Sequence, residues 1–164
     1  CYKTTEPNIG LSLNRDSLSI KCYMADTGLF ISHAFDDKGI VSEEVYLKIL
    51  KDKLEMNGGM IIENIVAQML RASGHKLFFF SSQSRTDKES RMEIDFLISK
   101  AKVTSRHNIS PIEVKSTQRY TTNSLNKCIR KYGQYLDVPY VIHTADYKIE
   151  NGITYLPLYM TPLL

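Results

Sequence analysis

The sequence predicts an α/β layered domain. One reason is that helical and strand-like patterns succeed one another along the chain as helix, sheet, helix and strand. A second reason is size and composition, because 164 residues that are 43% hydrophobic and 24% charged suit one globular domain with one core. The third is a pair of short apolar runs at the centre of the chain, "MEIDFLIS" (92–99) and "SPIEVKS" (110–116).

The N-terminal third predicts few regular elements. The segment "SLSIKCYMADTGLF" is expected to form a strand or a short helix with a turn at Asp26–Gly28, and "DDKGI" is expected to turn. Residues 41–56 predict a helix because their apolar residues recur at near-helical spacing. Residues 1–56 therefore predict a lead-in and a helix in front of a core at 57–164.

The remaining two thirds predict a more regular succession. A helix over 60–74 ends at Gly74, which is a suitable C-terminal cap. The runs 92–99 and 110–116 are predicted to be an antiparallel pair joined by a basic loop. The other expected elements are a strand over 76–82, a loop over 83–91, a helix over 123–135, a strand over 139–145 and a strand over 152–160.

Positive charge is concentrated in one part of the chain. The net charge is only +3, but residues 100–131 contain eight Lys or Arg against one acid, so this segment is +7 and the rest is −4. Such a segment can attract a polyanion such as nucleic acid. Taken alone, however, a lysine-rich stretch is more commonly a solvated surface.

Cysteine usage and hydropathy predict a cytoplasmic protein. Cys1, Cys22 and Cys128 are widely spaced and form no C-x-x-C pair, so neither a disulfide framework nor a zinc site is expected. No apolar stretch approaches the roughly 20 residues of a membrane span, and the first residues given do not have the basic-then-apolar layout of a secretory signal. The abrupt opening "CYKTTEPNIG" suggests a piece of a longer chain.

The acids of the two central strands predict a metal site. Side chains alternate along a strand, so Ile94, Phe96 and Ile98 are expected on one face and Glu93, Asp95 and Leu97 on the other. On the second strand, Glu113 and Lys115 share a face. If the strands pair, the carboxylates of Asp95 and Glu113 meet and need a compensating cation, for which Mg²⁺ is suited.

Lys115 would then lie beside the metal, where its ammonium could orient the attacking water or stabilise charge on a phosphoryl oxygen. The same three residues also have a simpler interpretation that needs no metal. A Glu and a Lys two residues apart on an exposed strand often form a weak ion pair, and a D…E-x-K pattern occurs by chance in many proteins.

Helix 60–74 contributes a further carboxylate. Asn64, Gln68 and Arg71 define its polar face, whereas Glu63 falls among the apolar residues that are expected to pack inward. A carboxylate there needs a partner, which could be the metal, a metal-bound water or Lys115. Alternatively, the helix dipole favours an acid near the N-terminus, and the side chain escapes to the edge of the apolar stripe.

Together, Glu63, Asp95 in "MEIDFLI", and Glu113 and Lys115 in "PIEVKS" resemble the PD-(D/E)XK phosphodiesterase superfamily, which includes restriction endonucleases and many repair nucleases. The chain is most similar to one branch, the C-terminal domain of uncharacterised function that follows an AAA-type ATPase module in bacterial and archaeal ATPases. The segments that carry this similarity are "KCYMADTGLF", "GGMIIENIVAQML", "LFFFSS", "EIDFLI", "PIEVKS", "NSLNKCIRKYG" and "GITYLPLYM".

The resemblance implies a restriction-endonuclease-like fold with a central mixed sheet and a set of site residues. Asp95 and Glu113 match the metal-binding carboxylates, Lys115 matches the catalytic lysine, and Glu63 matches the helix acid that assists at the metal. The carbonyl of Val114 matches a further ligand position, and the ion would be Mg²⁺ or Mn²⁺. Ile94 stands where the superfamily has the proline that gives it its name.

The resemblance also implies partners. These are nucleic acid, most simply DNA, and an ATPase domain upstream in the same chain, which alone would bind ATP because no phosphate-binding G-x-x-x-x-G-K-[ST] loop occurs here. A homo-oligomer is a further option, and no membrane is expected. The cations expected to bind nucleic acid are Lys100, Lys102, Arg106, Arg119, Lys127, Arg130 and Lys131.

Three functions are compatible with these residues: a Mg²⁺-dependent nuclease domain, a nuclease-like module that binds nucleic acid without cutting it, and a docking or oligomerisation domain for the ATPase. The complete acid set favours the first, since a binding module has no need of three convergent acids. A structural role is favoured if Glu63 is solvent-exposed and remote from Asp95.

Overall fold

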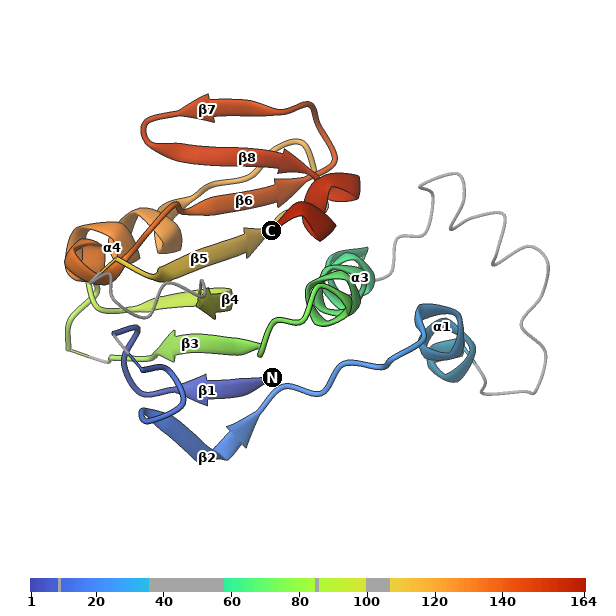
Figure 1. The fold of residues 1–164 in the computed structure, drawn as a ribbon, viewed down its shortest axis with the longest axis horizontal. Helices are drawn as coiled ribbons and strands as arrows, with labels where there is room; N and C mark the ends of the chain where they lie inside the picture. Colours follow the sequence, from blue (N-terminus) through green and yellow to red (C-terminus); the bar gives the residue numbers. More distant parts are fainter. Residues whose placement is uncertain (9, 36–57, 85, 100–106) are drawn as a thin grey trace.

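The structure is a computed structural model that describes residues 1–8, 10–35, 58–84, 86–99 and 107–164. It contains an eight-stranded mixed sheet with flanking helices (Figure 1), which confirms the predicted α/β class. The strands are β1 (Tyr2–Thr4), β2 (Arg15–Ile20), β3 (Phe78–Ser82), β4 (Met92–Ser99), β5 (Ile109–Val114), β6 (Tyr140–His143), β7 (Lys148–Glu150) and β8 (Ile153–Pro157). The helices are α1 (Thr27–Phe35), α3 (Gly58–Ala72), α4 (Asn123–Tyr132) and the short 3₁₀ segments η1 (Gly133–Tyr135) and η2 (Leu158–Leu163).

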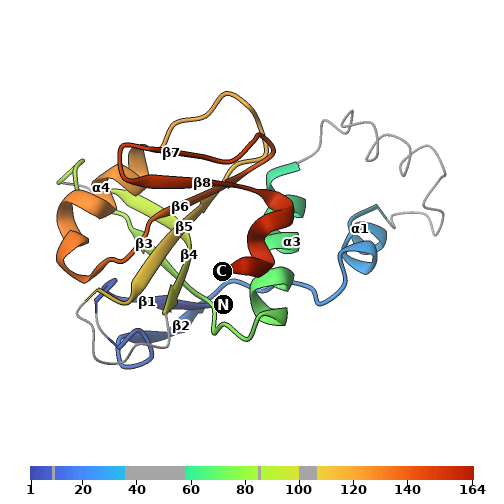
Figure 2. The same cartoon turned by 45° about the horizontal axis from the view of Figure 1, so that its top comes forward.

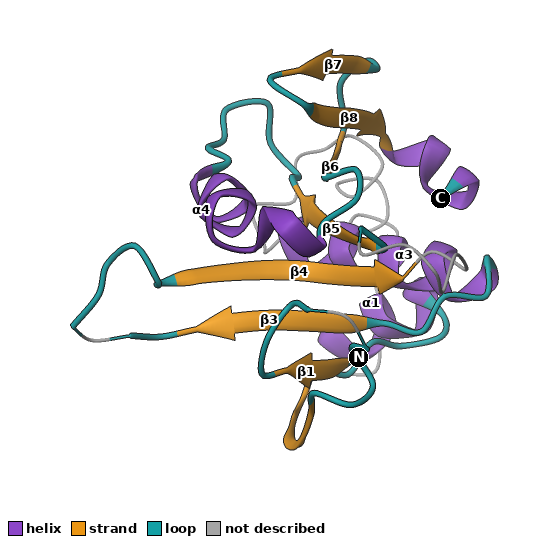
Figure 3. Cartoon of the chain, turned by 60° about the vertical axis from the view of Figure 1, so that its left-hand side comes forward, coloured by secondary structure: helices purple, strands orange, loops and turns teal. Residues whose placement is uncertain are grey.

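The strand order in the sheet is β2-β1-β3-β4-β5-β6-β8-β7. Strands β3, β4 and β5 are antiparallel neighbours, whereas β5, β6 and β8 run parallel. Figure 3 shows β4 as a long strand beside β3, near the middle of the sheet. The expected antiparallel pairing of the runs 92–99 and 110–116 is therefore confirmed, with Phe96 opposite Ile112.

Helices α3 and α4 lie on opposite sides of the sheet (Figure 2) and bury two separate apolar clusters against it. On the α3 side, Leu70 packs with Phe96 and Ile112. On the α4 side, Leu125 packs with Leu97. The central strands are thus covered on both faces, which is why they appear in the sequence as nearly continuous apolar runs.

The predicted face assignment of β4 is wrong at Ile94. Phe96 and Ile98 lie in the cluster on the α3 side, but Ile94 lies with Leu97 in the cluster on the α4 side. The cause is an irregularity in the β3–β4 ladder, where the register shifts between Phe78 and Phe80. An inserted residue reverses the alternation of side chains on one side of it. Asp95 lies at this reversal.

Helix α3 ends as predicted. Gly74 has φ +91°, a left-handed conformation that glycine adopts without a steric penalty, and the Gly74 amide donates to the carbonyl of Arg71. The predicted polar face of α3, however, does not face solvent throughout. Asn64 is buried and Gln68 is partly buried, because both bond to the chain segment at Met24.

The N-terminal segment contains both of the alternatives that its sequence left open, a strand (β2) followed by a helix (α1). The expected turn at Asp26–Gly28 is instead the start of α1, where Asp26 Oδ1 accepts the Leu29 amide at 2.8 Å as an N-cap. Strand β1 was not predicted. The turn expected in "DDKGI" and the helix expected over 41–56 lie outside the described residues.

The C-terminal part follows the prediction with two differences: β7 was not predicted, and the strand expected over 152–160 ends at Pro157, after which η2 begins. The expected helix over 123–135 is α4 followed by η1, and the expected strands are β6 and β8. The unpredicted β7 forms a hairpin with β8 through Asn151 and Gly152, which have φ of 52° and 76°. Positive φ at both positions is typical of a tight two-residue hairpin turn. None of the described helices combines the length and the apolar character that crossing a membrane would require.

Candidate functional site

Asp95 lies where β4 and β5 stop pairing through their backbones. The paired residues run from Ser99 opposite Ile109 to Phe96 opposite Ile112, so Asp95 and Glu113 are the next facing positions. There the Val114 amide donates to Asp95 Oδ2 at 2.8 Å. The Asp95 carboxylate thus accepts a hydrogen bond from a backbone amide of the neighbouring strand, and this bond holds Asp95 against β5.

The surroundings of Asp95 favour its protonated form. Burial raises the pKa of Asp95 to about 7, although the hydrogen bond from Val114 acts in the opposite direction. The charges of Glu63 and Glu113 also raise this pKa, and Lys21 lowers it. Asp95 is therefore electrostatically coupled both to the acid on α3 and to the acid on β5.

Glu113 and Lys115 form a partly enclosed ion pair. Glu113 is 6% exposed, and Lys115 Nζ lies 2.7 Å from its Oε1. Burial raises the pKa of Glu113, while the hydrogen bond and charge of Lys115 lower it, as does the Leu125 amide in the first turn of α4. The second carboxylate oxygen, Oε2, is buried and has no hydrogen-bond partner among the described residues. A buried acceptor without a donor is costly.

Glu63 points toward the sheet side of α3 and is paired, but not with Lys115. Tyr23 donates its hydroxyl to Glu63 Oε1, and Lys21 Nζ lies 3.2 Å from the same oxygen. Lys21 also lies 2.9 Å from Glu93 Oε1. The Glu63 side chain is 23% exposed, so the helix acid is neither fully buried nor free in solvent.

Lys21 acts as a local cation for this acidic group. Burial alone would lower its pKa, but the hydrogen bond that Lys21 donates to Glu93 and the charges of Glu63 and Asp95 raise the pKa of Lys21. For Tyr23, burial followed by the contact with Glu63 raises the pKa, so the hydroxyl keeps its proton and acts as a donor.

Asn64 fastens to α3 the segment that directly follows Lys21 and Tyr23. Its Oδ1 accepts the Met24 amide at 2.9 Å, and its Nδ2 donates to the carbonyl of Met24 at 3.2 Å and to Thr27 Oγ1 at 3.1 Å. The segment that follows β2 is therefore fastened along α3. This is the physical reason for the burial of Asn64.

The four predicted site residues thus form two groups with Asp95 between them. Glu63 belongs to a group with Lys21 and Tyr23, and Glu113 belongs to a group with Lys115. The first turn of α3 also approaches the second group, since a Cβ on Gly59 would lie 3.7 Å from Ser116 Oγ. Within the described part of the chain, no three His, Cys, Asp or Glu side chains form a group that could hold a metal ion.

The predicted nucleic-acid-binding cations have varied surroundings. Lys127 Nζ donates to the carbonyls of Lys88 and Arg91, at 2.7 and 3.3 Å. Arg130 and Lys131 bond to Glu89 and Ser90 of the same loop. These three cations of α4 therefore hold the loop before β4, and Arg119 lies exposed in the β5–α4 connection. Lys100, Lys102 and Arg106 lie outside the described residues.

Sequence reasoning missed Lys21, Tyr23 and Glu93 as members of the site. Lys21 and Tyr23 are separated from Glu63 by about 40 positions, and no periodic pattern links them. For Glu93, the alternation along the strand predicts only a position on the same face as Asp95. The one available signal was the alternation "KCY", which places Lys21 and Tyr23 on a common side of an extended segment.

Comparisons with known proteins place the chain in a family without assigning it an activity. Residues 58–161, which make up more than half of the chain, match the family described as a domain of unknown function (DUF4143). This range includes Glu63, Asp95, Glu113 and Lys115. No significant match was found among curated proteins or among solved structures. The chain belongs to the DUF4143 family.

Proposed function

We propose that this chain is a nuclease-like domain that hydrolyses phosphodiester bonds of DNA with the help of Mg²⁺ or Mn²⁺. The observation that carries the proposal is the pair of facing acids on β4 and β5. Glu113 is buried with one carboxylate oxygen lacking a donor among the described residues, Asp95 is held against the same strand, and Lys115 lies 2.7 Å from Glu113.

The chemistry of these groups suits a hard divalent ion. Mg²⁺ commonly uses one or two protein carboxylates together with water and substrate phosphate, so a set of three protein acids is not required. Asp95 and Glu113 would hold the ion, with the carbonyl of Val114 as a further oxygen ligand and Glu63 assisting. Bound there, the ion would supply a Lewis acid and a water of lowered pKa.

The chain itself contributes charge and orientation. Lys115 presents an ammonium beside the two acids, where it would stabilise negative charge on a phosphoryl oxygen. Tyr23 and Lys21 hold Glu63 at the edge of the same region. Lys21 lies 3.2 Å from Glu63 and 2.9 Å from Glu93 of β4, so the helix acid is linked to the strand that carries Asp95.

The wider context supports the same proposal. A mixed sheet with α3 and α4 on opposite sides is compatible with the restriction-endonuclease-like fold that the sequence resemblance implies. The matched family is known as a C-terminal region of AAA-ATPase-associated proteins. We therefore propose an ATPase domain of the same chain as its partner, with ATP bound only by that domain.

The second candidate is a module that binds nucleic acid or docks the ATPase without cleaving. It is favoured by the ion pairs already present, because Glu63 and Glu113 each have a lysine partner. In that case the acids would serve as a polar network. Removing one lysine would then lower the free energy of unfolding, and no variant would cleave DNA.

The deciding experiment is cleavage of single-stranded, duplex and branched DNA in the presence of Mg²⁺, Mn²⁺ or EDTA. The wild-type chain should cut at least one substrate in a metal-dependent manner, and Asp95→Ala and Lys115→Ala should each reduce the rate by about 100-fold or more, as expected for loss of a charge-stabilising group.

The matched control is Lys148→Ala, which removes a lysine from an exposed ion pair on β7 and should leave the rate unchanged. Far-UV circular dichroism establishes that each variant is folded. Inactivity of the wild-type chain with every substrate and metal, alone and with an ATPase partner, would refute the nuclease proposal and favour the second candidate.

A further inference from the structure

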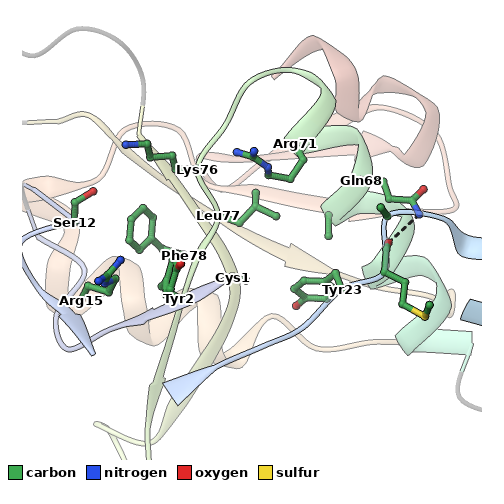
Figure 4. Close-up of a pocket in the computed structure, with 13 residues that line it drawn as sticks. Cys1, Tyr2, Ser12, Arg15, Tyr23, Gln68, Arg71, Lys76, Leu77 and Phe78 are labelled. Carbon is green, nitrogen blue, oxygen red and sulfur yellow. Dashed lines mark hydrogen bonds between the residues drawn. The ribbon is translucent and has the colours of Figure 1, made fainter. Parts of the chain in front are cut away.

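A second region with different chemistry lies beside the acidic site. It is a cavity of about 640 Å³ bordered by the N-terminal strands, the start of β3 and the C-terminal half of α3 (Figure 4). Its volume falls within the range of sites for small organic ligands, about 300–1,000 Å³. The proposed hydrolysis assigns no role to it.

Cations surround this cavity. Arg15 comes from β2, Arg71 from the last turn of α3, and Lys76 from the segment between α3 and β3. Figure 4 shows Arg15 on one side of the Phe78 ring, with Arg71 and Lys76 across from it. None of the described residues that line the cavity is acidic. The cavity therefore has the charge of an anion site, and guanidinium groups suit phosphate in particular.

Aromatic rings form part of its wall. Tyr2 is 44% exposed and tilts against the buried Phe78, with ring centroids 6.5 Å apart. The guanidinium of Arg15 lies over the Tyr2 ring, with its carbon 4.6 Å from the ring centre. A base that stacks on Tyr2 would take the place of this guanidinium and leave it to meet the adjoining phosphate. An exposed ring next to cations is the arrangement with which proteins bind unpaired bases of a single strand, because the base stacks while the cations take the phosphate.

One residue joins this cavity to the acidic site. Tyr23 lines the cavity, and its hydroxyl donates to Glu63. A strand lying in the cavity would therefore pass next to the Glu63 carboxylate at its Tyr23 end. Duplex DNA does not expose base faces for stacking on Tyr2, whereas an unpaired strand does.

We infer that this cavity binds a single-stranded nucleic acid segment, with an unpaired base on Tyr2 and the adjoining phosphates among Arg15, Arg71 and Lys76. The inference deepens the proposed function, on which it rests, by assigning that site an unpaired strand as substrate. The same groups would hold a strand whether or not the acids cut it.

The test is binding in EDTA, measured by fluorescence anisotropy with a labelled oligothymidylate and with a labelled duplex of the same length. The wild-type chain should bind the single strand more tightly than the duplex. Tyr2→Leu should weaken single-strand binding about tenfold, while Tyr2→Phe should retain it, because the ring supplies the stacking. The double variant Arg15→Gln/Lys76→Gln should weaken binding and lower the salt dependence by about one unit per cation removed.

The control is Lys148→Gln, which removes one positive charge from β7 at the opposite edge of the sheet and should not change binding. Arg71 is left intact because its guanidinium also bonds to the carbonyl of His75. Equal affinity of Tyr2→Leu and the wild type, or an equal loss in Lys148→Gln, would overturn the inference. Because the assay contains no metal, its failure is distinguishable from failure of cleavage.

Discussion

Asp95 and Glu113 occupy facing positions of β4 and β5, yet their neighbours differ. Glu113 is balanced by Lys115 at 2.7 Å, whereas Asp95 makes its hydrogen bond to a backbone amide and is influenced by two other acids. The charge of Lys115, in direct contact with Glu113, opposes the effect of burial there. At Asp95 the charge of Lys21 also lowers the pKa, but no ion pair to Asp95 forms among the described residues. This difference is the reason that burial dominates at Asp95.

The raised pKa of Asp95 predicts how stability depends on pH. An unfolded aspartic acid titrates at about 3.9, whereas folded Asp95 titrates at about 7, so between these values the folded protein binds one more proton than the unfolded chain. The free energy of unfolding should therefore fall as pH rises through this window, by at most about 1.4 kcal/mol per unit from this residue. The favourable contribution is complete only below pH about 4.

Urea denaturation of the metal-free protein at a series of pH values measures this slope. The Asp95→Asn variant keeps an oxygen that can accept the Val114 amide but loses the titration, so its slope should be smaller. Glu113, whose pKa is also raised by burial, leaves a residual slope of the same sign. Parallel curves for the variant and the wild type would contradict the assignment of the proton to Asp95.

At the scale of elements, α3 organises the site. It carries Glu63, fastens Met24 through Asn64, and begins next to Ser116. Its amphipathic pattern was sufficient to predict the helix and its terminal glycine. The pattern did not indicate that part of the polar face would be buried, because that burial depends on a segment about 40 residues earlier in the chain.

The C-terminal cap of α3 can be tested against a matched glycine. A Cβ at Gly74 or at Gly133 would meet no atom within 4 Å, but Gly74 has φ +91° whereas Gly133 has φ −50°. Gly74→Ala should therefore lower the free energy of unfolding by about 1 kcal/mol through backbone strain alone. Gly133→Ala should be neutral or stabilising by up to about 1 kcal/mol.

Urea midpoints of the two variants provide the comparison. Because neither substitution creates a steric contact, the difference between them isolates the effect of the left-handed backbone. Equal midpoints would show that Gly74 does not keep this conformation in solution.

At the scale of the whole molecule, one sheet joins two apolar clusters. The α3 side and the α4 side share the strands β4 and β5, which contribute residues to both. The loss of either cluster exposes one face of the same strands, so the two sides should unfold together rather than as separate units.

Leu70 and Leu125, both fully buried on opposite sides, test this coupling. Each change to Ala should lower the free energy of unfolding by about 2–5 kcal/mol. Met60→Ala on the exposed side of α3 should change it by no more than about 0.5 kcal/mol. In each variant, tyrosine fluorescence and far-UV circular dichroism should give coincident unfolding curves; separate transitions would show that the clusters are independent.

The local patterns of the chain were enough to predict most of the helices and strands, because the periods of helices and strands are local properties, but they did not predict the short strands β1 and β7. The sequence by itself also predicted that the runs 92–99 and 110–116 pair as antiparallel strands, since this pairing follows from their order along the chain and the short connection between them. The other features of the site depend on how the sheet is assembled. The irregularity that places Asp95 between the two faces depends on the register with β3, and the pairing of Glu63 with Lys21 depends on contacts between distant segments. Such contacts leave no periodic trace in the chain, because they are set by how the sheet is assembled.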